Sequence, residues 1–469
     1  MAQSWTSSEL ELALGLPPGP LFGPRLQARL RDAARTGVLD AGATLPSTRE
    51  LAAQLEVARG TVVSAYEQLV AEGYLVTTPG GRTSVSPAAR RPTPARPGAP
   101  VPTRLRYDLR PGVPDLAHFP SADWSWALSQ AARRIRPADL DYGDGRGHPE
   151  ALDVLAAHLR RSRAAVAHPD DVIFATGFAQ CVALVFEVLA ARGVRTLAVE
   201  DPGDRSVDIP ARREGLRLVP IPVDRDGIDV EQLTDSPADA VLVTPAHQSP
   251  TGAVLSPGRR TALVEWASTR GAWIIEDDYD SEFRYDRQPV GALQGLAPDR
   301  VILVGSASKT HAPALRLAWL AAPAALVNAL AEAKRLADRG GSAIDQLALA
   351  TLIESGRHER QVRAMRGIYS ERRRVLVGAL AARLPGARLS GLEAGFHGVL
   401  ELPTGSSEDA VVSAAADRSL RLVGLSASTL ARRDLSPSLV LGFGNIDNES
   451  LVEAIALLAG CIRSDRASW

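Results

Sequence analysis

Five short apolar segments, separated by longer stretches of helical periodicity, constrain the fold of this chain most. Segments that are apolar along their whole length are typical of parallel strands covered by helices on both faces of a sheet. We therefore predict an α/β domain with a mostly parallel sheet. The five candidate strands are VIFAT at 172–176, TLAVED at 196–201, AVLVTP at 240–245, AWIIED at 272–277 and VILVGS at 301–306.

A proline-rich segment separates this domain from a shorter N-terminal unit. Residues 87–104 carry six prolines and almost no large apolar side chains, which is typical of an extended linker. The 469 residues also exceed what one hydrophobic core usually organises. We predict an N-terminal domain at 1–86, a linker at 87–106 and a C-terminal domain at 107–469.

The N-terminal unit has the pattern of a winged helix-turn-helix. A first helix is predicted from Pro20 to Arg35, and Ser47 with Glu50 forms a capping box that begins a second helix. A third helix follows after a short link and ends near Gly73. Residues 74–86 then read as a two-stranded hairpin, the wing.

Polar residues on this unit are placed to contact DNA. Arg59, Thr61 and Ser64 lie on the outer face of the third helix, where side chains can enter a major groove. Arg49 is placed for a phosphate, and Arg82 extends from the wing. Residues 1–106 carry 12 arginines and 8 acidic residues, and this basic excess suits a polyanion. The alternative is a three-helix domain for protein contacts.

A lysine and an arginine follow the last candidate strand. The motif GSASKT at 305–310 contains Lys309, and Arg316 follows seven residues later. A lysine that forms a Schiff base needs an enclosed site where its amine can lose a proton. Ser306 and Arg316 suit a phosphate. The chain has one other lysine, Lys334, which we predict to be solvated on a helix.

Two further strand ends carry matching groups. Asp277 ends a strand and Tyr279 follows two residues later, so a carboxylate can hold a pyridinium nitrogen protonated and a phenol can reach a ring oxygen. The segment ATGFAQ at 175–180 joins a strand to a helix, where the amides of Phe178 and Ala179 can bind phosphate. Each motif alone also occurs in ordinary loops and caps, and the prediction rests on their joint order.

The N-terminal unit resembles the winged-helix domain of the GntR family of bacterial transcription regulators over about residues 19–86. Ala58 stands where those regulators usually have a serine. Residues from about Tyr107 to Cys461 resemble the fold-type I aminotransferases that bind pyridoxal 5′-phosphate (PLP). The two together resemble the MocR-type subfamily of GntR regulators.

The resemblance implies a role for each motif residue. Lys309 would form the Schiff base with PLP, and Asp277, Tyr279 and the segment around His247 would contact the ring. The phosphate would be held by this chain and by Tyr142 reaching from a head-to-tail partner subunit. The phosphate residues of this chain would be Ser306, Arg316, Phe178 and Ala179. The implied function is a PLP-dependent regulator that binds operator DNA and senses an amino compound or PLP itself.

Three departures bear on whether such a body catalyses transamination. Asp204 replaces a frequent aromatic residue near the cofactor, and Ser249 replaces an asparagine. Val440 stands where aminotransferases place the arginine that binds the substrate carboxylate. We interpret the body as a sensor, with neutral drift as the alternative for these differences. A working aminotransferase with an attached DNA-binding domain, and a regulator that has lost its cofactor, remain rival hypotheses.

The remaining features exclude other classes. Cys181 and Cys461 are the only cysteines, which argues against a disulfide framework or a cysteine-based zinc site. The start has no signal-peptide pattern and no apolar run is long enough for a membrane helix, so a cytoplasmic protein is expected. Histidines such as His118, His148 and His311 lack metal-ligand spacing, and we predict surface or loop positions and no metal.

Overall fold

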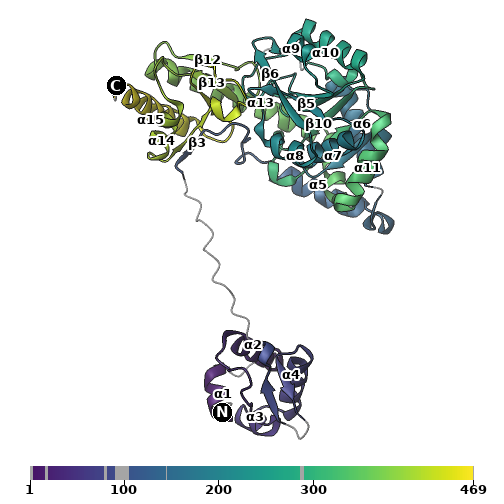
Figure 1. Cartoon of the computed structure of the whole chain (residues 1–469), viewed down its shortest axis with the longest axis vertical. Coiled ribbons are helices and arrows are strands. Elements are labelled where there is room, and N and C mark those ends of the chain that lie inside the picture. The colour runs from purple at the N-terminus through teal and green to yellow at the C-terminus, as the bar shows by residue number, and fades with distance from the viewer. Residues whose placement is uncertain are drawn as a thin grey trace. The chain divides into compact units, whose positions relative to one another are not determined.

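The computed structural model describes residues 4–15, 20–78, 82–89, 105–143, 145–285 and 290–467. The chain forms two compact units, Met1–Pro102 and Thr103–Trp469, which are described separately (Figure 1). The predicted tip of the wing at 79–81, most of the predicted linker and Asp144 lie outside the described residues.

The first unit contains three packed helices and a two-stranded antiparallel ribbon, preceded by a short helix. Leu26, Leu30, Leu51, Val62 and Leu69 form its core, so the helices bury the stripes that the sequence predicts. The elements are α1 (Ser7–Leu14), α2 (Phe22–Thr36), α3 (Thr48–Gln54), α4 (Arg59–Ala71), β1 (Leu75–Thr77) and β2 (Thr83–Val85).

Helix ends in this unit follow the local sequence. The Ser47 hydroxyl accepts a hydrogen bond from the Glu50 amide and the Glu50 carboxylate accepts one from the Ser47 amide, which confirms the predicted capping box. Helix α1 was not predicted, although Thr6 and Glu9 form the same kind of box. Ala58 is the N-cap of α4, and its methyl group cannot accept a hydrogen bond from the first turn. The serine that usually stands here in the regulators that the chain resembles could do so.

The second unit is built on an eight-stranded sheet with the order β4-β11-β10-β9-β8-β5-β6-β7. Strands β5, β6, β8, β9 and β10 run parallel to one another, and β11 runs antiparallel between β10 and β4. All five predicted strands are present, and the predicted α/β class is confirmed. The strands are β4 (Val172–Ala175), β5 (Thr196–Asp201), β6 (Arg217–Asp224), β7 (Gly227–Ile228), β8 (Ala240–Val243), β9 (Trp273–Asp278), β10 (Val301–Ser306) and β11 (Ala318–Ala321).

Helices cover both faces of this sheet (Figure 1). One face buries alternate strand residues such as Val199 and Ile302 against α7 (Phe178–Ala191), α8 (Asp208–Arg213) and α11 (Ala324–Asp338). On the other face two groups of helices bury the opposite positions, such as Leu303 and Val241. These helices are α5 (Ser121–Arg134), α6 (Pro149–Arg163) and α12 (Ala343–Glu354), then α9 (Val230–Asp235) and α10 (Pro257–Arg270).

The rest of this unit forms a smaller subdomain. Its four-stranded sheet has the order β12-β13-β16-β15, and β3 (Tyr107–Asp108) pairs with β14 (Leu420–Arg421). The strands are β12 (Arg388–Ser390), β13 (His397–Glu401), β15 (Val423–Gly424) and β16 (Ser438–Gly442). The helices are α13 (Arg357–Arg383), α14 (Glu408–Ala416) and α15 (Asn448–Ala467). None of the helices in the described ranges combines the length and the apolar character that a membrane span requires.

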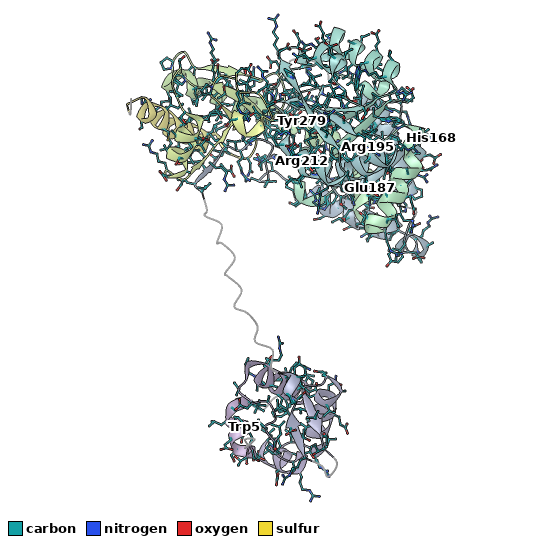
Figure 2. The ribbon with its side chains drawn as sticks, viewed as in Figure 1. Trp5, His168, Glu187, Arg195, Arg212 and Tyr279 are labelled. Atoms are coloured by element: carbon teal, nitrogen blue, oxygen red, sulfur yellow. The ribbon has the colours of Figure 1, made fainter. Side chains whose placement is uncertain are left out.

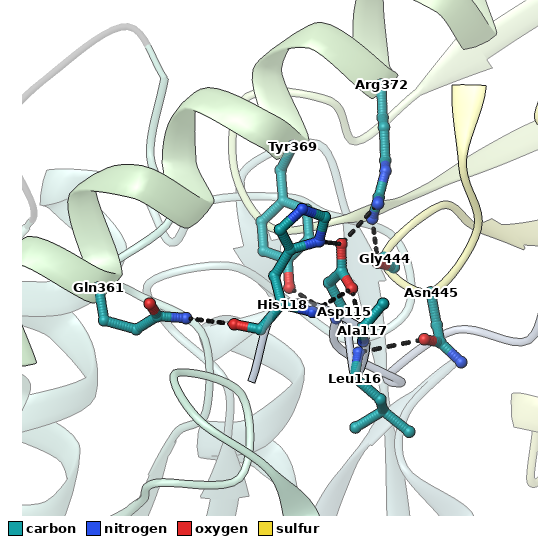
Figure 3. Close-up of polar contacts among 9 residues, drawn as sticks. All are labelled: Asp115, Leu116, Ala117, His118, Gln361, Tyr369, Arg372, Gly444 and Asn445. Carbon is teal, nitrogen blue, oxygen red and sulfur yellow. Dashed lines mark hydrogen bonds and ion pairs between the residues drawn. The ribbon is translucent and has the colours of Figure 1, made fainter. Parts of the chain in front are cut away.

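The chain between β3 and α5 is held to this subdomain by one buried carboxylate (Figure 3). Asp115 forms an ion pair with Arg372 of α13 at 2.5 Å, and its Oδ2 atom lies 2.8 Å from His118 Nδ1. The Asp115 amide donates to the Tyr369 hydroxyl at 2.9 Å, and the Leu116 amide donates to Asn445 at 3.1 Å. These contacts fix the segment that contains Gly112, which lies at the site described next.

Candidate functional site

The three predicted motifs lie at the carboxyl ends of parallel strands. Asp277 is near the end of β9 and is aligned with Val304 of β10, and Lys309 follows the end of β10. Phe178 begins α7 directly after β4. Because parallel strands end at one edge of a sheet, the fold brings these groups to one place, where α/β proteins usually bind ligands.

The amine of Lys309 is enclosed and has a specific partner. Its Nζ atom donates a hydrogen bond to the Gly112 carbonyl at 2.6 Å. Burial lowers the pKa of Lys309, whereas the nearby carboxylates of Asp277, Asp280 and Asp204 act in the opposite direction. A lysine with a lowered pKa in an enclosed site can react with an aldehyde. No signal in the sequence indicated Gly112.

Asp277 has a buried carboxyl group that forms no ion pair with another residue in the described part of the chain. Burial raises its pKa well above the usual range, and Asp204 adds to this effect while Lys309 opposes it. The next residue, Asp278, binds Arg163 through two hydrogen bonds of 2.6 and 2.9 Å. The two neighbouring aspartates are therefore in different environments, and Asp277 is the one that can accept a proton or face a cationic ring.

Tyr279 and His247 form a second polar group at this edge. The Tyr279 hydroxyl lies 3.2 Å from His247 Nδ1, and Asp280 Oδ2 lies 2.8 Å from the same nitrogen. Burial disfavours the charged ring, but the Asp280 carboxylate outweighs it and raises the pKa of His247. A Cβ atom at Gly395 would overlap Asp280 and His247. Tyr279 lies where the large sheet meets the subdomain (Figure 2).

The N-terminus of α7 has the groups that an anion site needs. The first amides of a helix, here those of Phe178 and Ala179, have no acceptor within the helix and attract anions. Arg316 Nη2 donates to the Thr176 carbonyl at 2.6 Å, so its guanidinium lies at the same helix end. A Cβ atom at Gly177, whose φ is +96°, would overlap that guanidinium. Only glycine allows this approach.

A hydrogen-bond network that ends on a buried lysine supports this loop. Gln180 accepts hydrogen bonds from the amide and hydroxyl of Thr176 at 2.8 and 2.9 Å, and donates to Asp338 at 2.7 Å. Asp338 also binds Lys334 Nζ at 2.7 Å. The expectation that Lys334 is solvated is wrong, since it is 0% exposed. Its i,i+4 carboxylate partner and the apolar face of α11 explain the burial.

The other two predicted phosphate residues, Ser306 and Tyr142, have different contacts. The Ser306 hydroxyl, at the end of β10, accepts a hydrogen bond from the Ser308 amide at 3.4 Å. The Tyr142 side chain is 77% exposed, and the guanidinium of Arg339 lies 5.6 Å from the centre of its ring. Its role in binding a phosphate remains a prediction that involves a second subunit.

The residues that depart from the aminotransferase pattern are held by ordinary contacts. Val440 lies in the middle of β16, opposite Val399 of β13, and packs in a small apolar cluster with Leu425. It is 0% exposed, so this position offers no group for a carboxylate. Asp204 accepts hydrogen bonds from the amide and hydroxyl of Ser206, and thus caps a short 3₁₀ turn.

The predicted DNA-contacting residues lie at the surface of the first unit. Arg49 of α3, Arg59 and Ser64 of α4, and Arg82 at the start of the second wing strand are exposed, and Thr61 is half-buried. The opposite side of α4, which includes Val62, Tyr66 and Leu69, is buried in the core. Their contacts with DNA remain predictions.

Comparisons with known proteins match both units. Residues 24–85 match the family "Bacterial regulatory proteins, gntR family", and residues 109–423 match "Aminotransferase class I and II". The chain is similar to the HTH-type pyridoxine biosynthesis transcriptional regulator PdxR of Corynebacterium glutamicum, with 33% identity over 97% of this chain and 99% of that protein. It is also similar to the probable rhizopine catabolism regulatory protein MocR of Rhizobium meliloti, with 32% identity over 95% and 96%.

A solved structure supports the fold of the second unit. The kynurenine aminotransferase of Pyrococcus horikoshii, in complex with PMP, aligns with a TM-score of 0.70 and 24% identity over 77% of this chain and 92% of that one. At this identity the likeness concerns the fold alone. Together with the two full-length relatives, the matches establish that the chain belongs to the MocR-type subfamily of the GntR transcription regulators, with a winged helix-turn-helix and an aminotransferase-like domain.

Proposed function

We propose that this protein is a transcription regulator that binds operator DNA through its first unit and PLP through its second. The ligand that changes its activity is an amino compound or PLP itself. The observation that carries this proposal is the enclosed Lys309 amine, at the same sheet edge as the buried Asp277 carboxyl and the Arg316–α7 anion site.

The residues at this edge fit the cofactor. PLP supplies an aldehyde, an electron-withdrawing ring and a dianionic phosphate. Lys309 would bind the aldehyde covalently, Asp277 the ring nitrogen, and Tyr279 and His247 the side of the ring hydroxyl. The remaining residues would hold the phosphate, and Gly177 keeps the space that the arginine needs. The phosphate residues are Ser306, Arg316, Phe178, Ala179 and Tyr142 of a second subunit.

The contact between Lys309 and Gly112 suggests how binding is transmitted. Covalent attachment leaves Nζ with at most one N–H group, which then has to serve either the Gly112 carbonyl or the cofactor. Gly112 belongs to the segment that Asp115 anchors to Arg372 and Tyr369, and this segment follows the linker to the first unit. A ligand that favours one arrangement of this segment would shift the population of DNA-binding states.

A head-to-tail homodimer in the cytoplasm is part of this proposal. The exposed Tyr142 side chain is available to a neighbouring subunit. The rival function is a working aminotransferase that carries a DNA-binding domain. The apolar surroundings of Val440 favour the regulator, since no arginine stands there to bind a substrate carboxylate.

The experiment that tests the proposal combines two measurements on the full-length protein. Visible absorption after addition of PLP should show a band above 400 nm, characteristic of a lysine-bound PLP, which Lys309→Ala abolishes. Operator binding, followed by fluorescence anisotropy, should change with PLP in the wild type and not in Lys309→Ala. A colourless wild type, or an equal PLP response in the variant, would contradict the proposal. Turnover of an amino donor and a keto acid at about 1 per second or faster would favour the enzyme.

A further inference from the structure

Three histidines that are far apart in sequence lie together in the second unit. His158 is in the last turns of α6, His358 is in the first turn of α13, and His311 follows Lys309 by two residues. The ring centroids of His158 and His358 are 5.1 Å apart, and those of His311 and His358 are 5.2 Å apart with the rings stacked. His311 lies in a turn, as expected of a loop residue, but its side chain is buried and not at the surface.

Each of these rings has a nitrogen without a hydrogen-bond partner among the residues that the structure describes. The atoms are His158 Nδ1, His358 Nδ1 and His311 Nε2. The side chains of all three histidines are buried, so water does not supply the missing partners. An unpaired buried polar atom lowers the stability of the folded state by about 1–3 kcal/mol. A ligand that bound all three nitrogens would remove this cost.

A carboxylate completes the cluster. Glu282 follows β9 in the chain, and one ligand atom each from His158, Glu282 and His358 lies within 4.8 Å of the others. The nearby Arg163 is bound to Asp278 at 2.6 Å, and Glu282 forms no ion pair with another residue that the structure describes. Its carboxylate is therefore available to a cation.

We infer that His158, Glu282 and His358 bind a divalent transition-metal ion, for which zinc is the best match. Two imidazoles and one carboxylate are a zinc ligand set, whereas magnesium and calcium take oxygen ligands. Three atoms no more than 4.8 Å apart can all lie within about 2.8 Å of one point. Each has to move by less than about 1 Å to reach the zinc bond length of about 2.1 Å.

Neighbouring groups suit such a site. Glu359 Oε1 lies 3.8 Å from His158 Nδ1 and is held by Arg161 at 3.0 Å. Its other oxygen is buried, with no hydrogen-bond partner in the described part of the chain. This carboxylate can orient His158 or complete the coordination. The ion would also fix His358 and, through the stacked His311, the segment that contains Lys309.

A second cluster offers a rival position for a metal. Donor atoms of His247, Asp280 and His397 also lie within 4.8 Å of one another. However, His247 Nδ1 already contacts Asp280 and Tyr279, and its Nε2 lies 3.4 Å from the Gly391 carbonyl. A metal there would have to displace these contacts. The experiment therefore compares the two clusters directly.

The test uses chelator-treated, full-length protein, dialysed against Zn²⁺ for metal analysis and titrated with Co²⁺ for visible spectroscopy. We expect one ion per chain in the wild type. Residues that only hydrogen-bond to a metal ligand already change metal affinity by about 10–100-fold. Loss of a ligand itself, in His158→Phe or His358→Phe, should therefore weaken binding by at least about 10-fold. His397→Phe and the surface variant His168→Phe, whose native side chain is 68% exposed, should retain the ion. No stoichiometric ion in the wild type, or loss in His397→Phe alone, would overturn the inference.

A conservative variant guards against misfolding. Glu282→Gln keeps the shape of the side chain and removes its charge. Zn²⁺ should raise the melting temperature of the wild type and of His168→Phe, because it binds the folded state. It should have little effect on Glu282→Gln. An equal rise in Glu282→Gln would show that this carboxylate does not bind the ion and would overturn the assignment.

Discussion

The guanidinium of Arg316 lies against Gly177, in the space that a Cβ atom at position 177 would fill. The same guanidinium donates to the Thr176 carbonyl at 2.6 Å, directly before the first turn of α7. One glycine therefore decides whether a cation can stand at this helix N-terminus. The proposed phosphate site combines this guanidinium with the amides of Phe178 and Ala179.

The first prediction concerns this glycine. Gly177→Ala should weaken PLP binding by about 10-fold or more, because the arginine is displaced and a charge-assisted contact with phosphate is lost. Binding is measured by the change in absorption or fluorescence on titration with PLP. Gly193→Ala is the matched control, since Gly193 has a φ of +93° and open space around its Cβ position. Equal affinity in the two variants would contradict the proposed cradle.

The buried lysine gives a second prediction. Lys334→Met should destabilise the second unit by about 1–3 kcal/mol, because Asp338 loses its charged partner but is 25% exposed and keeps the hydrogen bond from Gln180. Urea unfolding of the full-length protein measures this change. Arg335→Met on the same helix is the control, and it should cost less than about 1 kcal/mol because its pair with Glu332 is at the surface. A small effect of Lys334→Met would mean that the network does not stabilise the loop.

The pH dependence of stability gives a third prediction. Burial raises the pKa of Glu200 from 4.5 to about 7, while hydrogen bonds from Thr244 and Gln248 oppose this shift. Between these two values the unfolded chain releases a proton that the folded chain retains. Folding should therefore weaken as pH rises from about 5 to 7, by up to about 10-fold in the equilibrium constant per pH unit for this group.

Denaturant unfolding at several pH values measures this effect. Glu200→Gln should reduce the fall in folding stability between about pH 5 and 7, because the amide keeps the shape of the side chain and does not titrate. Glu214→Gln, at an exposed position, should leave the decline as it is in the wild type. If the two variants have the same pH profile, Glu200 does not retain its proton in the folded state.

The fourth prediction concerns the DNA-binding face. Arg59→Ala should weaken operator binding by about 1–3 kcal/mol if the side chain contacts a base. Arg35→Ala, an exposed arginine at the end of α2, serves as the control in the same unit. Anisotropy titrations at two salt concentrations measure both. An unchanged affinity in Arg59→Ala would remove α4 as the recognition helix.

Much of the fold could be predicted from the sequence because parallel strands are buried on both faces. The five apolar runs became β4, β5, β8, β9 and β10 for that reason. Strand β6 was not predicted because Pro220 and Pro222 interrupt its pattern, and β11 was also missed. Helix α1 was missed although Thr6 and Glu9 gave a local signal.

The candidate site was predictable where its residues follow strand ends. Lys309, Asp277 and Phe178 lie at one sheet edge because the strands before them are parallel. Contacts such as Lys309 with Gly112 depend on how distant segments pack, and no spacing in the sequence encodes them. The histidine cluster could not be predicted for the same reason, because each of its members comes from a different segment.

Borohydride reduction followed by peptide mapping measures whether Lys309 binds PLP covalently. The chain contains one other lysine, Lys334, which is buried against Asp338 and serves as the internal control. We expect a stable pyridoxyl adduct on the peptide that contains Lys309 and none on the peptide that contains Lys334. An unlabelled Lys309 peptide from protein reduced in the presence of PLP would show that this lysine does not bind the cofactor covalently.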